Sequence, residues 1–125
     1  MLWAIEGSKL KKISDIPHRD IYSRLSSLSK TEYDSICEEL NNKIDTNEVH
    51  TSSWMPGHNW QGTVFEPIYT KAANYNREVS GLLFGIMLWV IMMERDDDWS
   101  FGRYKKGEID IKGMTYFRIS NPTEF

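Results

Sequence analysis

An uninterrupted apolar run of 12 residues, LLFGIMLWVIMM at 82–93, most constrains how this chain can fold. A helix needs about 20 apolar residues to cross the hydrocarbon core of a bilayer, so this run is too short to span a membrane. Asn76 can cap a helix at about 77–94 that is apolar nearly all round and enclosed by other elements. Gly81 and Gly85 share one face of it, which predicts close packing of another backbone rather than a ligand site.

Two helices are expected upstream of this run. The first covers about residues 17–28, where Pro17 suits the first turn. Its apolar residues recur at helical spacing, at Ile21, Leu25 and Leu28. The second covers residues 30–44, because Ser29 and Glu32 have the spacing of a capping box. Its pattern predicts a buried stripe made of Tyr33, Ile36, Cys37, Leu40 and Ile44.

The later part of the chain is expected to add a short helix and several strands. The short helix is placed at about residues 64–73. Its start is either a capping box of Thr63 and Glu66 or a first turn at Pro67. Residues 99–120 alternate apolar and polar side chains around turn glycines, which predicts a β-hairpin or three short strands. Together these elements predict an α+β fold in which one domain comprises the whole chain.

The order of these elements resembles that of a winged-helix module. Helices are followed by a terminal hairpin with basic residues near its tip, over about residues 30–120. The chain departs from the DNA-reading version of that module, in which the helix before the wing carries polar and basic groups into the major groove. Here that helix is the most apolar segment, so base readout by it is not expected.

The cysteine count and the charge narrow the class of protein. Cys37 is the only cysteine, which excludes a disulfide framework and a cysteine-based zinc cage and favours a reducing compartment. The N-terminal segment lacks the continuous apolar core of a signal peptide, so a cytoplasmic location is expected. The net charge is −3, but residues 1–98 carry 10 basic and 15 acidic side chains, whereas residues 99–125 carry 5 basic and 3 acidic ones.

This basic C-terminal segment is the first candidate binding surface. Basic side chains neutralise phosphates, and exposed aromatic rings stack on unpaired bases. The alternative is an ordinary hairpin whose charges only face solvent. The expected contacts with nucleic acid, with a single strand as one candidate ligand, are Arg103, Tyr104, Lys105, Lys106, Lys112, Tyr116 and Arg118.

The segment HTSSWMPGHNW at 50–60, together with the acidic triplet at 96–98, is the second candidate. Tryptophan and methionine are enriched at protein interfaces, and an acidic surface suits a basic partner. The alternatives are that both indoles fold back over the long apolar helix and that the triplet is a solvated loop ending it. The expected contacts with a protein partner are Trp54, Met55, His58, Trp60, Asp96, Asp97 and Asp98.

A catalytic pocket in the same segment is the third candidate. It would belong to a small hydrolase or transferase and would use His50, Ser52, Ser53 and His58. However, no G-x-S-x-G elbow surrounds the serines, the histidines have no metal-ligand spacing, and no phosphate-binding loop occurs. We therefore expect a small, non-enzymatic cytoplasmic binding or regulatory domain with no metal or other cofactor, which contacts nucleic acid or another protein but no membrane.

Overall fold

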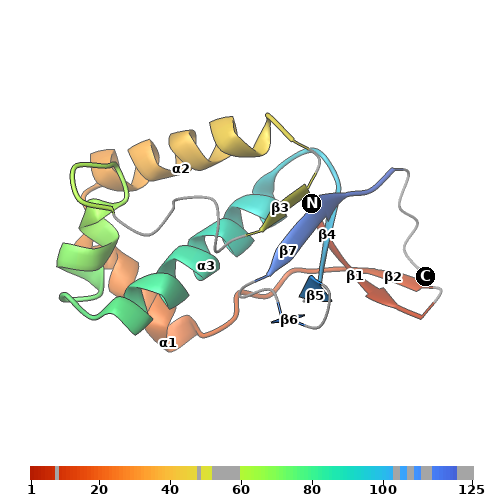
Figure 1. Cartoon of the computed structure of the whole chain (residues 1–125), viewed down its shortest axis with the longest axis horizontal. Helices are drawn as coiled ribbons and strands as arrows, with labels where there is room; N and C mark the ends of the chain where they lie inside the picture. Colours follow the sequence, from red (N-terminus) through yellow and green to blue (C-terminus); the bar gives the residue numbers. More distant parts are fainter. Residues whose placement is uncertain are drawn as a thin grey trace.

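The computed structural model describes residues 1–7, 9–47, 49–51, 60–102, 105–106, 109–110 and 114–120. In residues 49–51, 105–106 and 109–110 only the backbone is described. These parts form an α+β fold, as the sequence predicts (Figure 1).

A mixed five-stranded sheet has the strand order β2-β1-β4-β7-β3. The two C-terminal strands β4 and β7 pair antiparallel, which confirms the expected hairpin within residues 99–120. Strand β1 pairs parallel with β4, and the other neighbours are antiparallel. The strands are β1 (Leu2–Glu6), β2 (Lys9–Lys12), β3 (Val49–Thr51), β4 (Trp99–Gly102) and β7 (Thr115–Arg118), with a separate small pair of β5 (Lys105–Lys106) and β6 (Ile109–Asp110). The sequence patterns did not predict β1, β2 or β3.

The two longer helices begin and end where the sequence predicts, at α2 (Lys30–Ile44) and α3 (Arg77–Glu94). The helix expected at 17–28 is wrong in its form, because α1 (Arg19–Tyr22) is one turn long and continues as the 3-10 helix η1 (Ser23–Ser27). The helix expected at 64–73 contains instead a short π-helix, η2 (Ile68–Ala72). Only the two segments with strong start signals form regular long helices.

Side-chain caps explain the starts of α2 and α3. The backbone N–H of Glu32 donates to Ser29 Oγ at 3.1 Å, and the N–H of Ser29 donates to Glu32 Oε1 at 2.9 Å, so the capping box is confirmed. Asn76 Oδ1 accepts from the N–H of Val79 at 3.1 Å. The box proposed for Thr63 does not form, because the side chain of Glu66 accepts from the N–H of Gly62 instead.

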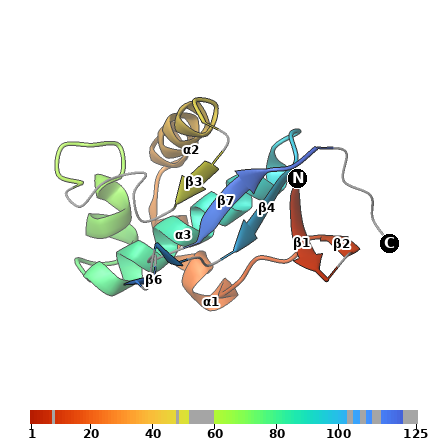
Figure 2. The ribbon, with the colours of Figure 1, turned by 45° about the vertical axis from the view of Figure 1, so that its right-hand side comes forward.

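Helix α3 lies between the sheet and the other helices (Figure 2). Nine of its residues are buried, and six of them belong to a core with Leu2, Trp99 and Tyr116 of the sheet. Of the stripe expected on α2, Ile36, Leu40 and Ile44 are buried in this core, and Tyr33 and Cys37 are partly buried against it. Within the described residues, the close backbone approach expected at Gly81 and Gly85 is wrong, since a Cβ built at either glycine meets none of their atoms within 4 Å outside the helix's own backbone. In the described ranges, no helix has the length and hydropathy needed to cross a bilayer.

Candidate nucleic-acid interface

The sheet joins the two basic ends of the sequence. Residues 1–13 carry three basic and one acidic side chain, and residues 99–125 carry five and three. The intervening residues 14–98, which form the helices and β3, carry seven basic and 14 acidic side chains. Because β1 pairs with β4, both basic segments contribute to one sheet, next to a helical part with the opposite charge balance.

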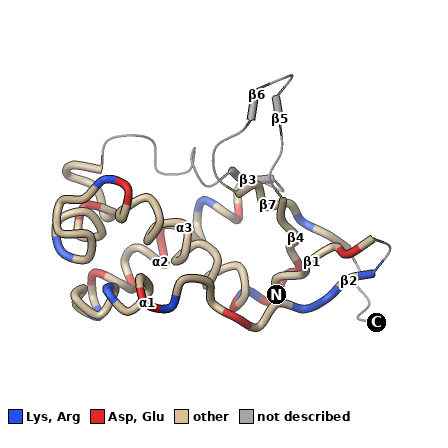
Figure 3. Tube along the Cα trace, turned by 90° about the horizontal axis from the view of Figure 1, so that it is seen from below, with Lys and Arg blue, Asp and Glu red and all other residues tan. Residues whose placement is uncertain are grey.

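Strand β2 is the most basic element of the described chain and forms one edge of the sheet (Figure 3). Its Lys9, Lys11 and Lys12 are all exposed. On the neighbouring strand Ile5 is 51% exposed and pairs in register with Leu10. The edge therefore presents three ammonium groups beside an exposed aliphatic side chain.

Sequence reasoning missed these three lysines, although a signal for their hairpin was present. Gly7 has a left-handed φ of 67°, a conformation that glycine adopts without strain. A Gly-Ser pair between two short runs is a recognised sign of a two-residue hairpin turn. The run KLKK has three lysines in four residues and only a weak alternation of apolar and polar side chains, so its pattern did not predict a strand.

The base of the β1–β2 hairpin is fixed to the start of β4 by polar contacts. The ammonium group of Met1 donates to the carbonyl oxygen of Asp97 at 2.6 Å and also to that of Arg95. Trp3 Nε1 donates to Asp98 Oδ1 at 3.0 Å, and Ser100 Oγ donates to the carbonyl of Trp3 at 2.8 Å. These contacts hold the first three residues of the chain in place.

Arg95 and Asp97 form the centre of an ion-pair network at the same end of the sheet. Arg95 Nε and Nη2 donate to the two oxygens of Asp97, both at 2.8 Å, and Nη1 donates to Asn41 Oδ1 at 2.7 Å. Arg118 Nη2 lies 3.2 Å from Asp97 Oδ2. The hydrogen bonds from Arg95 lower the pKa of Asp97 to about 2, and those to Asp97 raise the pKa of Arg95. Of the acidic triplet, Asp97 and Asp98 thus have partners within the fold, and Asp96 is exposed.

The structure corrects one of the expected base-stacking residues. Tyr116 is 1% exposed and belongs to the hydrophobic core, so its ring is not available to a base. Arg118 is partly engaged, because its guanidinium lies 5.0 Å from the Trp99 ring centroid in addition to its ion pair. Lys105 and Lys106 lie in β5, where only the backbone is described. Three further expected contacts, Arg103, Tyr104 and Lys112, lie outside the described residues.

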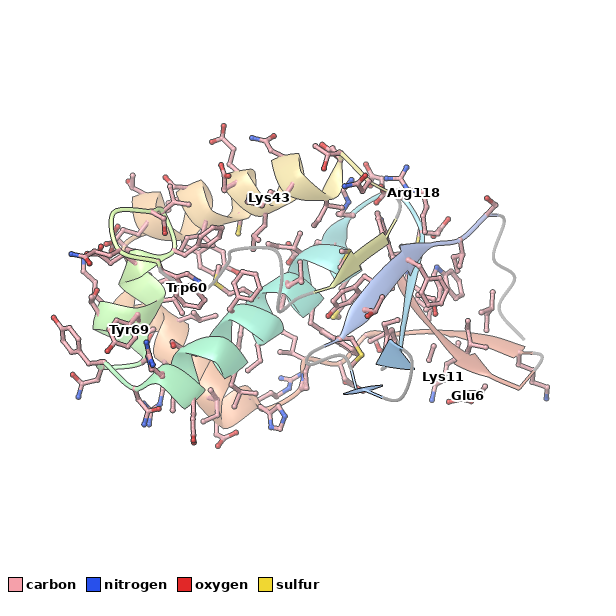
Figure 4. The ribbon with its side chains drawn as sticks, viewed as in Figure 1. Glu6, Lys11, Lys43, Trp60, Tyr69 and Arg118 are labelled. Atoms are coloured by element: carbon pink, nitrogen blue, oxygen red, sulfur yellow. The ribbon has the colours of Figure 1, made fainter. Side chains whose placement is uncertain are left out.

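The aromatic loop is described only at its end. Trp60 is half-buried, with its ring centroid 5.7 Å from that of Phe84 on α3 and 6.2 Å from that of Phe65 (Figure 4). This indole therefore folds back over the long helix, which was one of the two alternatives. The backbone of His50 pairs with Tyr116 in the register of β3 and β7. The other residues of the partner and catalytic candidates, Ser52, Ser53, Trp54, Met55 and His58, lie outside the described residues.

The described part of the chain contains no group of three or more histidine, cysteine, aspartate or glutamate side chains placed to hold a metal ion. Cys37 is half-buried on α2, and burial raises the pKa of its thiol. A raised pKa leaves less of the nucleophilic thiolate at neutral pH. No protein-family model, no curated protein and no solved structure matches this chain.

Proposed function

We propose that this chain is a small, non-enzymatic cytoplasmic domain that binds nucleic acid through the basic strands of its sheet. The observation that carries this proposal is the exposure of Lys9, Lys11 and Lys12 on a strand that shares a sheet with the basic C-terminal segment. Each lysine that neutralises a phosphate releases a condensed counterion, and this release is the main source of non-specific affinity.

The charge distribution supports one direction of approach. The acidic side chains concentrated in residues 14–98 repel a phosphate backbone, and the two basic terminal segments attract it. Figure 4 shows Lys11 at the hairpin end of the molecule and Tyr69 at the opposite, helical end. A polyanion would therefore meet the sheet end first.

Within this proposal, the contacts expected in the C-terminal hairpin are Arg103, Tyr104, Lys105, Lys106 and Lys112. The winged-helix resemblance enters only through this hairpin as a contact element. Helix α3 has no role in base readout, because nine of its residues are buried. The inward packing of Trp60 gives the aromatic loop less support as a partner site.

The test compares two triple variants with the same change in net charge. Lys9, Lys11 and Lys12 are replaced by Gln in one, and Lys30, Lys43 and Lys71 in the other. The second set lies outside the sheet and makes solvent-exposed ion pairs, each of which contributes only about 0 to 1 kcal/mol to stability. Fluorescence anisotropy with labelled DNA and RNA oligonucleotides is measured over a series of salt concentrations.

We expect the β2 variant to bind more weakly and to reduce the slope of log K against log salt by about 2 to 3, because three phosphate contacts are lost. The variant outside the sheet should keep the wild-type slope. Equal losses in both variants would show that only net charge matters and would contradict a site on β2.

A further inference from the structure

The β1–β2 hairpin extends beyond the sheet as a two-stranded arm. Its pairing with β4 ends after Trp3, whereas the two strands of the hairpin remain paired to its turn, from Trp3 with Lys12 to Glu6 with Lys9. None of the described residues from Ala4 to Lys12 is buried. Figure 1 shows this arm at the end of the molecule away from the helices.

The two faces of the arm have different chemistry. Paired residues of neighbouring strands project to the same face, and successive residues project to opposite faces. Ile5, Leu10 and Lys12 therefore share one face, and Glu6, Lys9 and Lys11 share the other. The face with Ile5 and Leu10 is mainly aliphatic and has one ammonium group, that of Lys12. Because lysines occur on both faces, their long side chains can reach negative charges on either side of the arm.

We propose that this arm inserts into the major groove of duplex DNA, an inference that rests on the proposed function and names its ligand class. The aliphatic face would lie against the floor of the groove, where the methyl groups of thymine offer apolar contact. The lysines would reach the phosphates on the two walls. Charge complementarity selects this ligand over an apolar partner surface, because Lys12 shares the face of the exposed Ile5 and Lys9 and Lys11 lie on the opposite face of the same two-stranded arm.

The dimensions of the arm agree with this groove. Three residues beyond Trp3, at about 3.3 Å each, extend roughly 10 Å, close to the groove depth of about 8.5 Å. Two paired strands lie about 4.8 Å apart, and the major groove, about 12 Å wide, admits such a ribbon. The minor groove is only about 6 Å wide, and the major groove of duplex RNA is too narrow for side chains to read.

The described aromatic residues favour a duplex over a single strand. Binding of unpaired bases usually depends on exposed rings on which the bases stack. Among the aromatic side chains of the described sheet residues, Trp3, Trp99 and Tyr116 are at most 7% exposed, and Phe101 and Phe117 are half-buried, so none presents a fully exposed ring. The exposed apolar side chain on the arm is instead the aliphatic Ile5, which suits contact with a groove.

The experiment pairs two substitutions that place a carboxylate on an exposed aliphatic position. Ile5→Asp changes the arm, and Val64→Asp is its control, since Val64 is 41% exposed and lies outside the sheet. Binding of each variant is measured with a 20-base-pair DNA duplex, with an RNA duplex of the same sequence, and with each of the two DNA strands alone. A fifth probe is the DNA duplex with bulky sugar groups on the 5-positions of its cytosines, which fill the major groove. Thermal melting confirms that both variants are folded.

We expect Ile5→Asp to weaken binding of duplex DNA about tenfold and Val64→Asp to leave it within about twofold. Duplex RNA and the sugar-modified duplex should bind wild-type protein about tenfold more weakly than plain duplex DNA. If the modified duplex binds as tightly as the plain one, or if Ile5→Asp and Val64→Asp behave alike, the groove inference is overturned. Lysine-dependent binding of single strands would then leave the proposed function intact. No binding of any of the five probes would overturn both.

Discussion

Asp97 is the residue on which the polar contacts near the sheet converge. Its carboxylate accepts two hydrogen bonds from Arg95 and pairs with Arg118, while its carbonyl accepts one from the Met1 ammonium. A carboxylate just after a helix C-terminus is repelled by the negative end of the helix dipole, so three consecutive aspartates at this place are unexpected. The bidentate contact with Arg95, two residues earlier in the chain, offsets that cost.

The lowered pKa of Asp97 predicts a loss of stability in acid. The folded pKa is about 2, below the ordinary value of 3.8, so the carboxylate stabilises the folded state above about pH 4. This contribution disappears as the pH falls towards 2. We expect Asp97→Asn to cost about 1 to 2 kcal/mol at pH 6, after allowance for solvent screening, and to approach wild-type stability near pH 2.

Urea unfolding of both proteins at several pH values measures this difference. Asp96→Asn removes the same charge from an exposed neighbour and serves as the control. A difference between Asp97→Asn and wild type that stays constant from pH 6 to pH 2 would show that the carboxylate makes no pH-dependent contribution.

At the scale of elements, local signals predicted the helices far better than the strands. The bounds of α2 and α3 followed from Ser29 and Asn76, because a cap and the helical spacing after it are contained in one short segment. The strands β1 and β3 depend on partners elsewhere in the chain, and Trp3 pairs with Ser100, 97 residues away. The candidate interface shows the same division: the sequence pattern indicated the basic C-terminal segment but not the lysines of β2, since only the pairing of β1 with β4 brings β2 into the same sheet.

A substitution at Gly81 tests whether the space beside helix α3 is open at this position. Gly81 is exposed in the middle of the helix, and no atom of another described element lies within 4 Å of a Cβ built there, so alanine should fit. We expect Gly81→Ala to raise the free energy of unfolding by about 0.5 to 1 kcal/mol, because alanine loses less backbone entropy in a helix.

The same substitution at Gly7 is the matched control. Gly7 also has open space but a φ of 67°, which costs an L-residue about 1 to 2 kcal/mol. Thermal melting should therefore shift in opposite directions for the two variants. A lower melting temperature for Gly81→Ala would mean that a backbone does approach this face.

At the scale of the whole molecule, the N-terminal strand β1 and the C-terminal strands β4 and β7 lie in one sheet. Residues from the start of the chain pair with residues near its C-terminus, and Leu2, Trp99 and Tyr116 enter one core with α3. The same pairing brings the two basic segments into one sheet and leaves the acidic segment to form the helices. Stability and the charge of the candidate interface therefore depend on one long-range strand pairing.

This dependence predicts different effects for two aliphatic residues of β1. Leu2 is fully buried, whereas Ile5 on the same strand is 51% exposed. We expect Leu2→Ala to lower the free energy of unfolding by about 2 to 4 kcal/mol, since it removes buried methyl groups and leaves a cavity in the core. Ile5→Ala should change it by no more than about 0.5 kcal/mol, because it alters an exposed side chain.

Urea unfolding is followed both by tryptophan fluorescence and by far-UV circular dichroism. If the pairing of β1 with β4 is integral to the core, the two signals should move together in Leu2→Ala; a fluorescence change that precedes the loss of helix would show that the hairpin detaches from a helical part that is stable without it.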